Sequence, residues 1–452
     1  MLIDCGGWNT NGAAVTPCVE DIHKTCGGEL DLLVVTHQHE DHVSGFNQAR
    51  ETFDKINVKE VWMSWIEDKS DNIAIILKDK YGKKLKESKK ITQQALKELQ
   101  NKRVPTVKGF GARMKAKKQS LEEALALIEF EEGTSYGKRL GVGKRTNDDA
   151  IDYVRGKGKK MRYWRPGNVI DDMSGAEGMK FYILGPPRDA DMKYFKIDTE
   201  ETEMYHLAAM NKEPTVEKLP QESIFKNDIG LEEGISPFAD NFKMEISELK
   251  LFNRYYNSTD VKWRQIETDW LETGAAIAMR ATNLTNNTSL AMAIEFASGK
   301  VVLLPGDAQS GNWMGWHKKD VKKSLKEKGG KDTEELLKDT VFYKVGHHGS
   351  HNGTASKSGL DFINNKDLVA AMPLIHNKVP EAWKPAGFPA KALYDVLIEK
   401  TKGRIIRTDQ GVITKTSAEQ MRNQLSSAQK REFKEGYLKG KNYVGFKIDG
   451  ME

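Results

Sequence analysis

The chain has 452 residues, of which 38% are hydrophobic and 30% are charged, and its formal net charge is +5. This composition is typical of a globular protein with a sizeable core, and it excludes a transmembrane helix, since no stretch approaches about eighteen consecutive apolar residues. Three cysteines without CxxC spacing, and a start without a basic and then apolar leader, predict reduced thiols and a cytoplasmic location.

Strand and helix patterns alternate in the first part of the chain. Residues 31–37 (DLLVVTH) form a short β-branched run that favours a buried strand. Residues 42–53 (HVSGFNQARETF) indicate a helix, and residues 58–65 (VKEVWMSW) indicate a second strand. A strongly charged region with helical periodicity follows at about 70–130.

Charge is distributed unevenly along the sequence. Residues 51–170 carry a net charge of roughly +11, and residues 171–250 carry roughly −9. The lysine-rich helical segment 83–118 could follow the phosphates of a nucleic acid, which makes nucleic acid a candidate partner. The alternative interpretation is that this segment forms a pair of surface helices whose lysines contact only solvent.

Regular patterns resume in the second half. Residues 179–187 (MKFYILGPP) predict a strand, whereas the acidic stretch after them has little pattern. Two apolar runs in residues 289–307 flank Ser298-Gly299 and predict a β-hairpin. Residues 340–354 (TVFYKVGHHGSHNGT) begin with another strand, and residues 393–415 predict a helix, a strand and a turn.

The densest cluster of metal-ligand residue types is H-x-H-x-D-H, formed by His37, His39, Asp41 and His42 directly after an apolar strand. Two imidazoles two residues apart can converge on one cation, and the Asp-His pair can face a second as the chain turns into a helix. Imidazole with carboxylate suits zinc, manganese or iron better than calcium. A lone histidine is usually structural, but four such side chains within six positions predict a metal site.

Two other strand ends carry residues of the same kind. Asp307 follows Pro-Gly after an apolar run, where its carboxylate could bridge two ions or simply close a turn. His347 and His348 follow a third strand, and Ser350 with the amides around Gly349 could bind a phosphate oxygen. Together with H-x-H-x-D-H, these strand ends predict one dinuclear centre.

The motifs LIDCG, THQHEDHVSG, ILGPP, NNTSLAMAI, LLPGDAQ, YKVGHHGSHNGT and RTDQGVI, in this order, resemble the metallo-β-lactamase fold hydrolases. The closest resemblance is to the hydrolase domain of ComEC-type DNA-uptake proteins and their soluble relatives. It implies an α/β fold, a four-layer αββα sandwich over residues 1–415, with insertions at about 68–145 and 188–265. Residues 416–452 would be a helical and strand extension.

The start of the chain departs from the resembled pattern. One or two strands normally precede LIDCG in that family, so the N-terminal strands look truncated. We expect either a short sheet edge or its completion by other residues. The C-terminal stretch KNYVGFKIDG or a partner chain could supply them.

The resemblance also implies a division of ligands between two divalent ions, with zinc as the first choice and manganese or iron as alternatives. His37 and His39 would hold the first ion. The second would be held by Asp41 and His42 together with one histidine of the pair His347 and His348, and Asp307 would bridge the two ions. The implied catalytic residues are Asp41, Asp307, His348 and Ser350. The histidine of the pair that binds no metal would donate a proton to the substrate.

One ligand of the first ion cannot be assigned from the sequence. The family often has a further metal-binding histidine in mid-chain, and here only His206 and the amides of Asn286 and Asn287 lie in that region. The third ligand of the first ion is therefore undetermined. Asp4, in LIDCG, matches a position that supports the histidine loop by hydrogen bonding.

The expected function is metal-dependent hydrolysis of phosphodiesters in DNA or RNA. The metal and the hydrolysis follow from the ligand residues, while the nucleic acid follows from the resemblance and the basic segment. One alternative is a hydrolase of a small ester, thioester, lactone or cyclic nucleotide, with a pocket lined by Trp263, Trp270, Trp313 and Trp316. The other is a binding or scaffold module that retains the fold without catalysis.

Overall fold

The structure is a computed structural model that describes residues 1–7, 10–101, 110–132, 145–188, 282–379 and 388–449. The described residues fall into two compact units, the first formed by residues 1–81, 129–188 and 282–449 and the second by residues 82–101 and 110–128. Strands and helices alternate in the first unit, which confirms the predicted α/β class. Most of the predicted acidic insertion lies outside the described residues.

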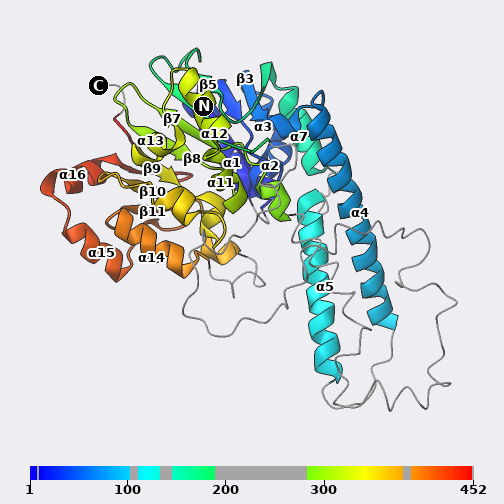
Figure 1. The fold of residues 1–452 in the computed structure, drawn as a ribbon. Helices are drawn as coiled ribbons and strands as arrows, with labels where there is room; N and C mark the ends of the chain where they lie inside the picture. The colour runs from blue at the N-terminus through cyan, green and yellow to red at the C-terminus, as the bar shows by residue number, and fades with distance from the viewer. Residues whose placement is uncertain (8–9, 102–109, 133–144, 189–281, 380–387, 450–452) are drawn as a thin grey trace. The chain divides into compact units, whose positions relative to one another are not determined.

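A four-stranded parallel sheet contains the N-terminal strands (Figure 1). Its order is β1 (Leu2–Ile3), β2 (Glu29–Val34), β3 (Asn57–Ser64) and β4 (Gly158–Trp164). The helices of this part are α1 (Gly12–Thr25), α2 (Glu40–Gln48), α3 (Arg50–Phe53) and α7 (Asn147–Arg155). The strands predicted at 31–37 and 58–65 and the helix predicted at 42–53 are confirmed to within a few residues.

The second sheet has eight strands in the order β12-β11-β10-β9-β8-β7-β6-β5. Their bounds are β5 (Val169–Ile170), β6 (Lys180–Ile183), β7 (Met292–Glu295), β8 (Val301–Leu304), β9 (Thr340–Lys344), β10 (Val369–Met372), β11 (Ile405–Arg407) and β12 (Gly411–Val412). Strands β8 to β11 are parallel, and the remaining neighbours are antiparallel. The predicted hairpin is β7–β8, and Gly299 at its turn has a φ of 80° that favours glycine.

Side chains that alternate along the strands create apolar cores on both faces of each sheet. Leu32 and Val34 of β2 pack in one core with Phe181 and Ile183 of the second sheet, so the two sheets share an interior. Leu33 points the other way and packs with residues of α1, α2 and α7. The outer face of the second sheet is covered by α11 (Ser310–Trp316), α12 (Lys319–Glu327), α13 (Thr333–Lys338) and α14 (Lys391–Lys400).

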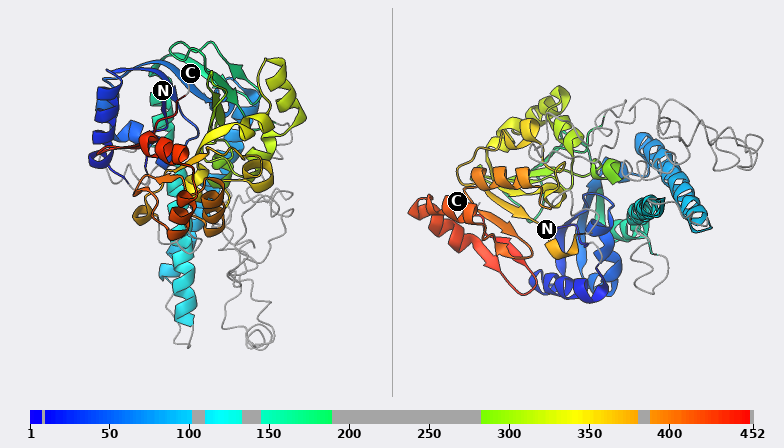
Figure 2. Two further views of the ribbon diagram at one scale, coloured as in Figure 1. Left: turned by 90° about the vertical axis from the view of Figure 1, so that its left-hand side faces the viewer. Right: turned by 90° about the horizontal axis from the view of Figure 1, so that it is seen from below.

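Two long helices occupy the region predicted to be charged and helical. They are α4 (Asn72–Asn101) and α5 (Phe110–Glu132), and within the second unit they lie side by side (Figures 1 and 2). Ala95 and Leu96 of α4 pack against Leu121 of α5. Exposed lysines on these helices are Lys83, Lys86, Lys90, Lys97 and Lys118. Over the described part of the chain, no helix is long and apolar enough to cross a membrane.

The C-terminal segment contains α15 (Thr416–Asn423), α16 (Ser427–Gly436), β13 (Tyr437–Lys439) and β14 (Val444–Phe446), and it clusters with the first unit. Phe433 and Phe446 pack against side chains of β9, β10 and β11, including Phe342. Phe342 also contacts the core between the sheets, so the segment covers part of the same sheet face. The hairpin β13–β14 forms its own sheet, and it does not pair with the outer strand β1.

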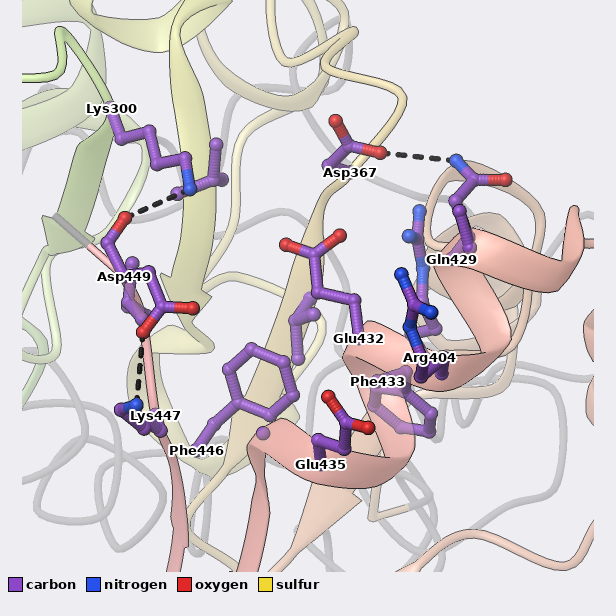
Figure 3. A pocket seen from close by; sticks show the side chains of 16 residues that line it. Lys300, Asp367, Arg404, Gln429, Glu432, Phe433, Glu435, Phe446, Lys447 and Asp449 are labelled. Carbon is purple, nitrogen blue, oxygen red and sulfur yellow. Dashed lines mark hydrogen bonds and ion pairs between the residues drawn. The ribbon is translucent and has the colours of Figure 1, made fainter. Parts of the chain in front are cut away.

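The hairpin also reaches the N-terminal part of the chain, because the Asn442 side chain donates to the Pro17 carbonyl of α1 at 3.4 Å (Figure 2). A cavity of about 360 Å³ lies between α16 and the starts of β9 and β10 (Figure 3). Lys300 and Asp449 line one side of it, and Asp367 and Gln429 line the other. The cavity is therefore at the amino ends of these parallel strands.

Truncation of Phe433 tests whether the C-terminal segment is part of the folded core. Phe433 is 8% exposed, so we expect Phe433→Ala to lower the free energy of unfolding by about 3–5 kcal/mol, because a buried aromatic side chain is lost. Denaturant unfolding followed by fluorescence measures the change. Tyr443→Ala is the control, since Tyr443 is 53% exposed, and equal effects of the two changes would contradict this packing.

Candidate metal centre

The three loops that the sequence singles out meet at the carboxyl ends of their strands. Asp41 and His42 lie in the first turn of α2, beyond β2, and Asp307 follows β8. His348 lies in a short 3-10 turn, Gly346–Gly349, that follows β9. One ligand atom from each of these four residues lies within 4.8 Å of the others. The structure thus joins residues separated by up to 307 positions in one cluster.

Asp4 fixes the orientation of His42. The Nδ1 atom of His42 lies 2.7 Å from Oδ2 of Asp4, and a carboxylate accepts hydrogen bonds, so Nδ1 carries the hydrogen. Asp4 also accepts bonds of 2.7 Å from the amide and from the hydroxyl of Thr36. The Nε2 atom of His42 therefore points into the cluster, where Oδ2 of Asp307 lies at 3.1 Å.

A backbone carbonyl fixes His348 in the same way. The Nδ1 atom of His348 donates to the carbonyl oxygen of Pro373 at 2.7 Å, so Nε2 is the nitrogen that faces the cluster. This Nε2 atom lies 2.8 Å from Oδ2 of Asp41 and 3.5 Å from Oδ2 of Asp307. Both histidines consequently direct Nε2 at the same carboxylate oxygens; this atom carries a proton in the metal-free chain and would offer its lone pair to a metal.

Asp307 is held so that only one of its oxygens faces the histidines. Its Oδ1 accepts the backbone N–H of His347 at 3.1 Å and lies 3.5 Å from the ammonium of Lys344. The Asp307 amide donates to the hydroxyl of Ser289 at 3.0 Å. Oδ2 is therefore the oxygen that faces the cluster. Contacts of Asp307 with His347, Lys344 and Ser289 fix its position.

The backbone of the histidine turn is strained. His347 has a φ of 46° and His348 has a φ of 52°, and both lie in the left-handed region that non-glycine residues seldom adopt. Such strain costs about 1–3 kcal/mol per residue and is concentrated at functional sites. Here it turns the His347 amide toward Asp307 and the His348 ring toward Asp41.

Close backbone contact explains the glycines of LIDCG and of α2. The amide of Cys5 donates to the His42 carbonyl, and the amide of Gly45 donates to the Cys5 carbonyl. A Cβ atom on Gly6 would lie 2.6 Å from the backbone of Asp41, and one on Gly45 would lie 2.5 Å from the Cys5 sulfur. Only glycines allow β1 and the H-x-H-x-D-H loop to approach so closely.

The cluster has the electrostatics of a cation site. Burial alone would lower the pKa of His42, but nearby carboxylates, Asp307 first among them, raise it well above its ordinary value. Burial would raise the pKa of Asp307, but His42 and His348 hold it well below its usual range. Without a metal, protons on the histidines would balance the buried carboxylates.

The donor atoms themselves fit a divalent metal. The buried atoms Oδ1 of Asp41 and Nε2 of His42 have no hydrogen-bond partner. Two imidazole nitrogens and two carboxylates form a ligand set that suits zinc, and hydrogen bonds that the rings donate to Asp4 and to the Pro373 carbonyl fix the ring orientations as metal sites require. Of the predicted ligand pair, His348 enters the cluster and His347 lies beside it.

His37 and His39 form a second buried pair next to this cluster. His37 is 1% exposed and His39 is 2% exposed. Nε2 of His37 and Nδ1 of His39 face each other at 3.0 Å. The ring centres of His37 and His42 are 4.1 Å apart, which places the two histidine groups in contact. Burial, with the neighbouring histidines, keeps the pKa of His37 well below its ordinary value, so its ring is neutral.

The sequence analysis missed a carboxylate beside this pair. Glu131, near the end of α5, lies 2.6 Å from Nε2 of His39. A signal was present, because Leu121, Ala124 and Ile128 recur at helical spacing and are buried, and Glu131 continues the same face. A charged residue at an apolar position of a helix indicates a buried partner.

His347 and Ser350 form a small hydrogen-bonded group. The Ser350 hydroxyl lies 2.7 Å from Nδ1 of His347 and donates to Oδ1 of Asn352 at 2.8 Å. Ser350 is only 3% exposed, which favours a role in orienting His347 over contact with substrate. Burial lowers the pKa of His347 to about 4, so its ring is neutral at pH 7 in the metal-free chain.

The two asparagines of NNTSL have different surroundings. Asn287 accepts hydrogen bonds from the amides of Gln309 and Asn312, so it shapes the turn. Asn286 donates to Nε2 of His347 at 3.3 Å, and its own buried oxygen has no hydrogen-bond partner. His206, the other candidate for the missing ligand, lies outside the described residues.

Comparison with known proteins found no matching family model, no matching curated protein and no matching solved structure.

Metal binding should depend on pH in a defined direction. The raised pKa of His42 means that the ring is protonated at pH 7 in the metal-free protein, and a cation must displace that proton. We therefore expect zinc binding at pH 7 to release at least about one proton and to tighten as the pH rises. Calorimetry in two buffers with different ionisation enthalpies measures the release. Binding that weakens with rising pH would contradict the assignment.

Proposed function

We propose that this chain is a metal-dependent hydrolase with the metallo-β-lactamase fold. The observation that carries the proposal is the convergence of Asp41, His42, Asp307 and His348 at the ends of three strands. The proposed four-layer sandwich is supported by two sheets that share one core and carry helices on their outer faces.

The ligands would divide between two ions. His42, His348 and Asp41 suit one ion, and Asp307, whose Oδ2 lies 3.1 Å from His42 and 3.5 Å from His348, would bridge to the other. His37 and His39 suit the other. Divalent ions bound at such a site supply Lewis acidity and lower the pKa of water toward neutrality.

The chain's own groups orient the reactants around these ligands. Oδ2 of Asp307 can accept a hydrogen bond from the attacking water, because Oδ1 is already engaged by His347 and Lys344. The side chain of His348 is 27% exposed, whereas that of Asp307 is only 2% exposed. A substrate would therefore approach from the His348 side, and the ammonium of Lys344, 3.5 Å from Oδ1 of Asp307, adds positive charge near the centre that favours an anionic group.

The favoured substrate is a phosphodiester of DNA or RNA. The motif resemblance supports this class, and so do the exposed lysines of the helical pair, which suit a phosphate backbone. The small-substrate alternative predicts a pocket lined by four tryptophans. Two of them, Trp313 and Trp316, are fully buried in the helix-covered core and do not line a pocket. Trp263 and Trp270 lie outside the described residues. Against a scaffold role stands the convergence of Asp41, His42, Asp307 and His348 in one cluster.

Removal of the carboxylate charge of Asp307 tests the hydrolase assignment. We expect Asp307→Asn to reduce hydrolysis of bis(p-nitrophenyl) phosphate and of DNA or RNA by about 100-fold or more, because the carboxylate orients the nucleophile. Initial rates at saturating zinc measure the loss, and circular dichroism checks the fold. Asp320→Asn, on an exposed side chain, is the matched control. Wild-type rates for Asp307→Asn, or no cleavage by the metal-loaded wild type, would refute the proposal.

The nucleic-acid assignment is tested separately on the helical pair. Replacing Lys83, Lys86 and Lys90 by glutamine should weaken nucleic-acid binding and reduce the slope of log affinity against log salt by about 2–3, because each phosphate contact contributes slightly less than one. Turnover of the small diester should not change. The matching triple arginine variant keeps the charge and should bind as the wild type does. Unchanged affinity in the glutamine variant would show that these lysines contact only solvent and do not bind nucleic acid.

A further inference from the structure

The hydrogen bonds around His37 and His39 place two lone pairs face to face. The Thr36 hydroxyl donates to Asp4, so it accepts from Nδ1 of His37 at 3.0 Å, and Nε2 of His37 keeps its lone pair. On His39, Nε2 lies 2.6 Å from the Glu131 carboxylate, which can only accept when ionised. The hydrogen of a neutral His39 is therefore on Nε2, and its lone pair is on Nδ1.

The spacing of these two nitrogens is 3.0 Å, which suits a hydrogen bond with a shared proton. Two nitrogen ligands of a tetrahedral zinc ion with bonds of about 2.0–2.1 Å are separated by about 3.3 Å, only slightly more. Two lone pairs that face each other in a buried site repel unless a proton or a cation binds both. A small opening of the pair would let an ion replace the proton and bind Nε2 of His37 and Nδ1 of His39.

Glu131 is itself held in place by two hydroxyl groups. Tyr81, in α4, donates to Oε2 of Glu131 at 2.8 Å, and Thr285 donates to the same oxygen at 2.8 Å. Burial alone would raise the pKa of Glu131, but His39 and these hydrogen bonds lower it. Its side chain is 1% exposed. With both oxygens engaged, Glu131 serves as an acceptor for His39 and is not needed as a ligand.

We propose that Glu131 is a positioning residue for the first metal: it holds the Nε2 hydrogen of His39 and so makes Nδ1 the ligand atom. This inference rests on the proposed function and deepens it. The carboxylate comes from the last turn of α5, and Tyr81 comes from α4, so both long helices contribute to the metal centre. The helical insertion then has a role in metal binding besides any contact of its lysines with substrate.

Graded zinc binding tests the inference without an activity assay. Dialysis at a series of free zinc concentrations, followed by elemental analysis, should show two ions per wild-type chain. Glu131→Gln should shift the midpoint of one ion to about 10–100-fold higher free zinc and leave the other ion in place, because loss of a carboxylate partner weakens a histidine ligand. Tyr81→Phe should give a smaller shift in the same direction. Glu122→Gln, on an exposed side chain of the same helix, is the matched control.

The protonation of His39 gives a second readout. Nitrogen-15 spectra of the histidine rings in the zinc-loaded wild type should show hydrogen on Nε2 and metal on Nδ1 of His39. An Nδ1-protonated His39, or wild-type zinc binding by Glu131→Gln, would overturn the inference. If the wild type binds no zinc at all, the proposed function fails. The ring spectra of the metal-free protein at pH 8 then decide on Glu131 alone: hydrogen on Nε2 of His39 supports its role, and hydrogen on Nδ1 opposes it.

Discussion

Carboxylates packed against imidazole nitrogens are the constraint on which the site depends. Asp41 and Asp307 are negatively charged in a nearly dry environment, and His42 and His348 point their Nε2 atoms at the carboxylate oxygens. Such a group is stable only with positive charge at its centre, supplied by protons or by a metal. Two groups outside the cluster, Asp4 and the Pro373 carbonyl, prevent the rings from turning away.

The fold places these side chains close together because it brings the ends of three strands to one place. The shared core fixes the two sheets against each other, so loops after β2, β8 and β9 meet although they are distant in sequence. Strained backbone at His347 and His348 and close-packed glycines at Gly6 and Gly45 complete the approach. The charged cavity beside α16 lies at the opposite ends of β9 and β10, so the C-terminal segment is a structural element that covers the sheet.

The ligand residues could be predicted from sequence because they are concentrated in short motifs directly after apolar runs. The choice between His347 and His348 could not, since it depends on consecutive left-handed backbone angles and on the Pro373 carbonyl. The contact of Glu131 with His39 could not be predicted for another reason. Glu131 is 92 positions from His39 in the sequence, and it belongs to a helix whose charge pattern predicts a solvent-exposed surface. Hydrophobic periodicity gives the type of an element, whereas the partner of one buried acid depends on tertiary contacts.

The convergence of ligands on a cation is the central claim, and anomalous diffraction from crystals grown with zinc tests it most directly. The claim predicts an anomalous peak at the zinc edge about 2.0–2.2 Å from Nε2 of His42 and Nε2 of His348, in contact with Asp307. A zinc-saturated crystal without density there, in which His42 and His348 remain hydrogen-bonded to the carboxylates, would contradict it.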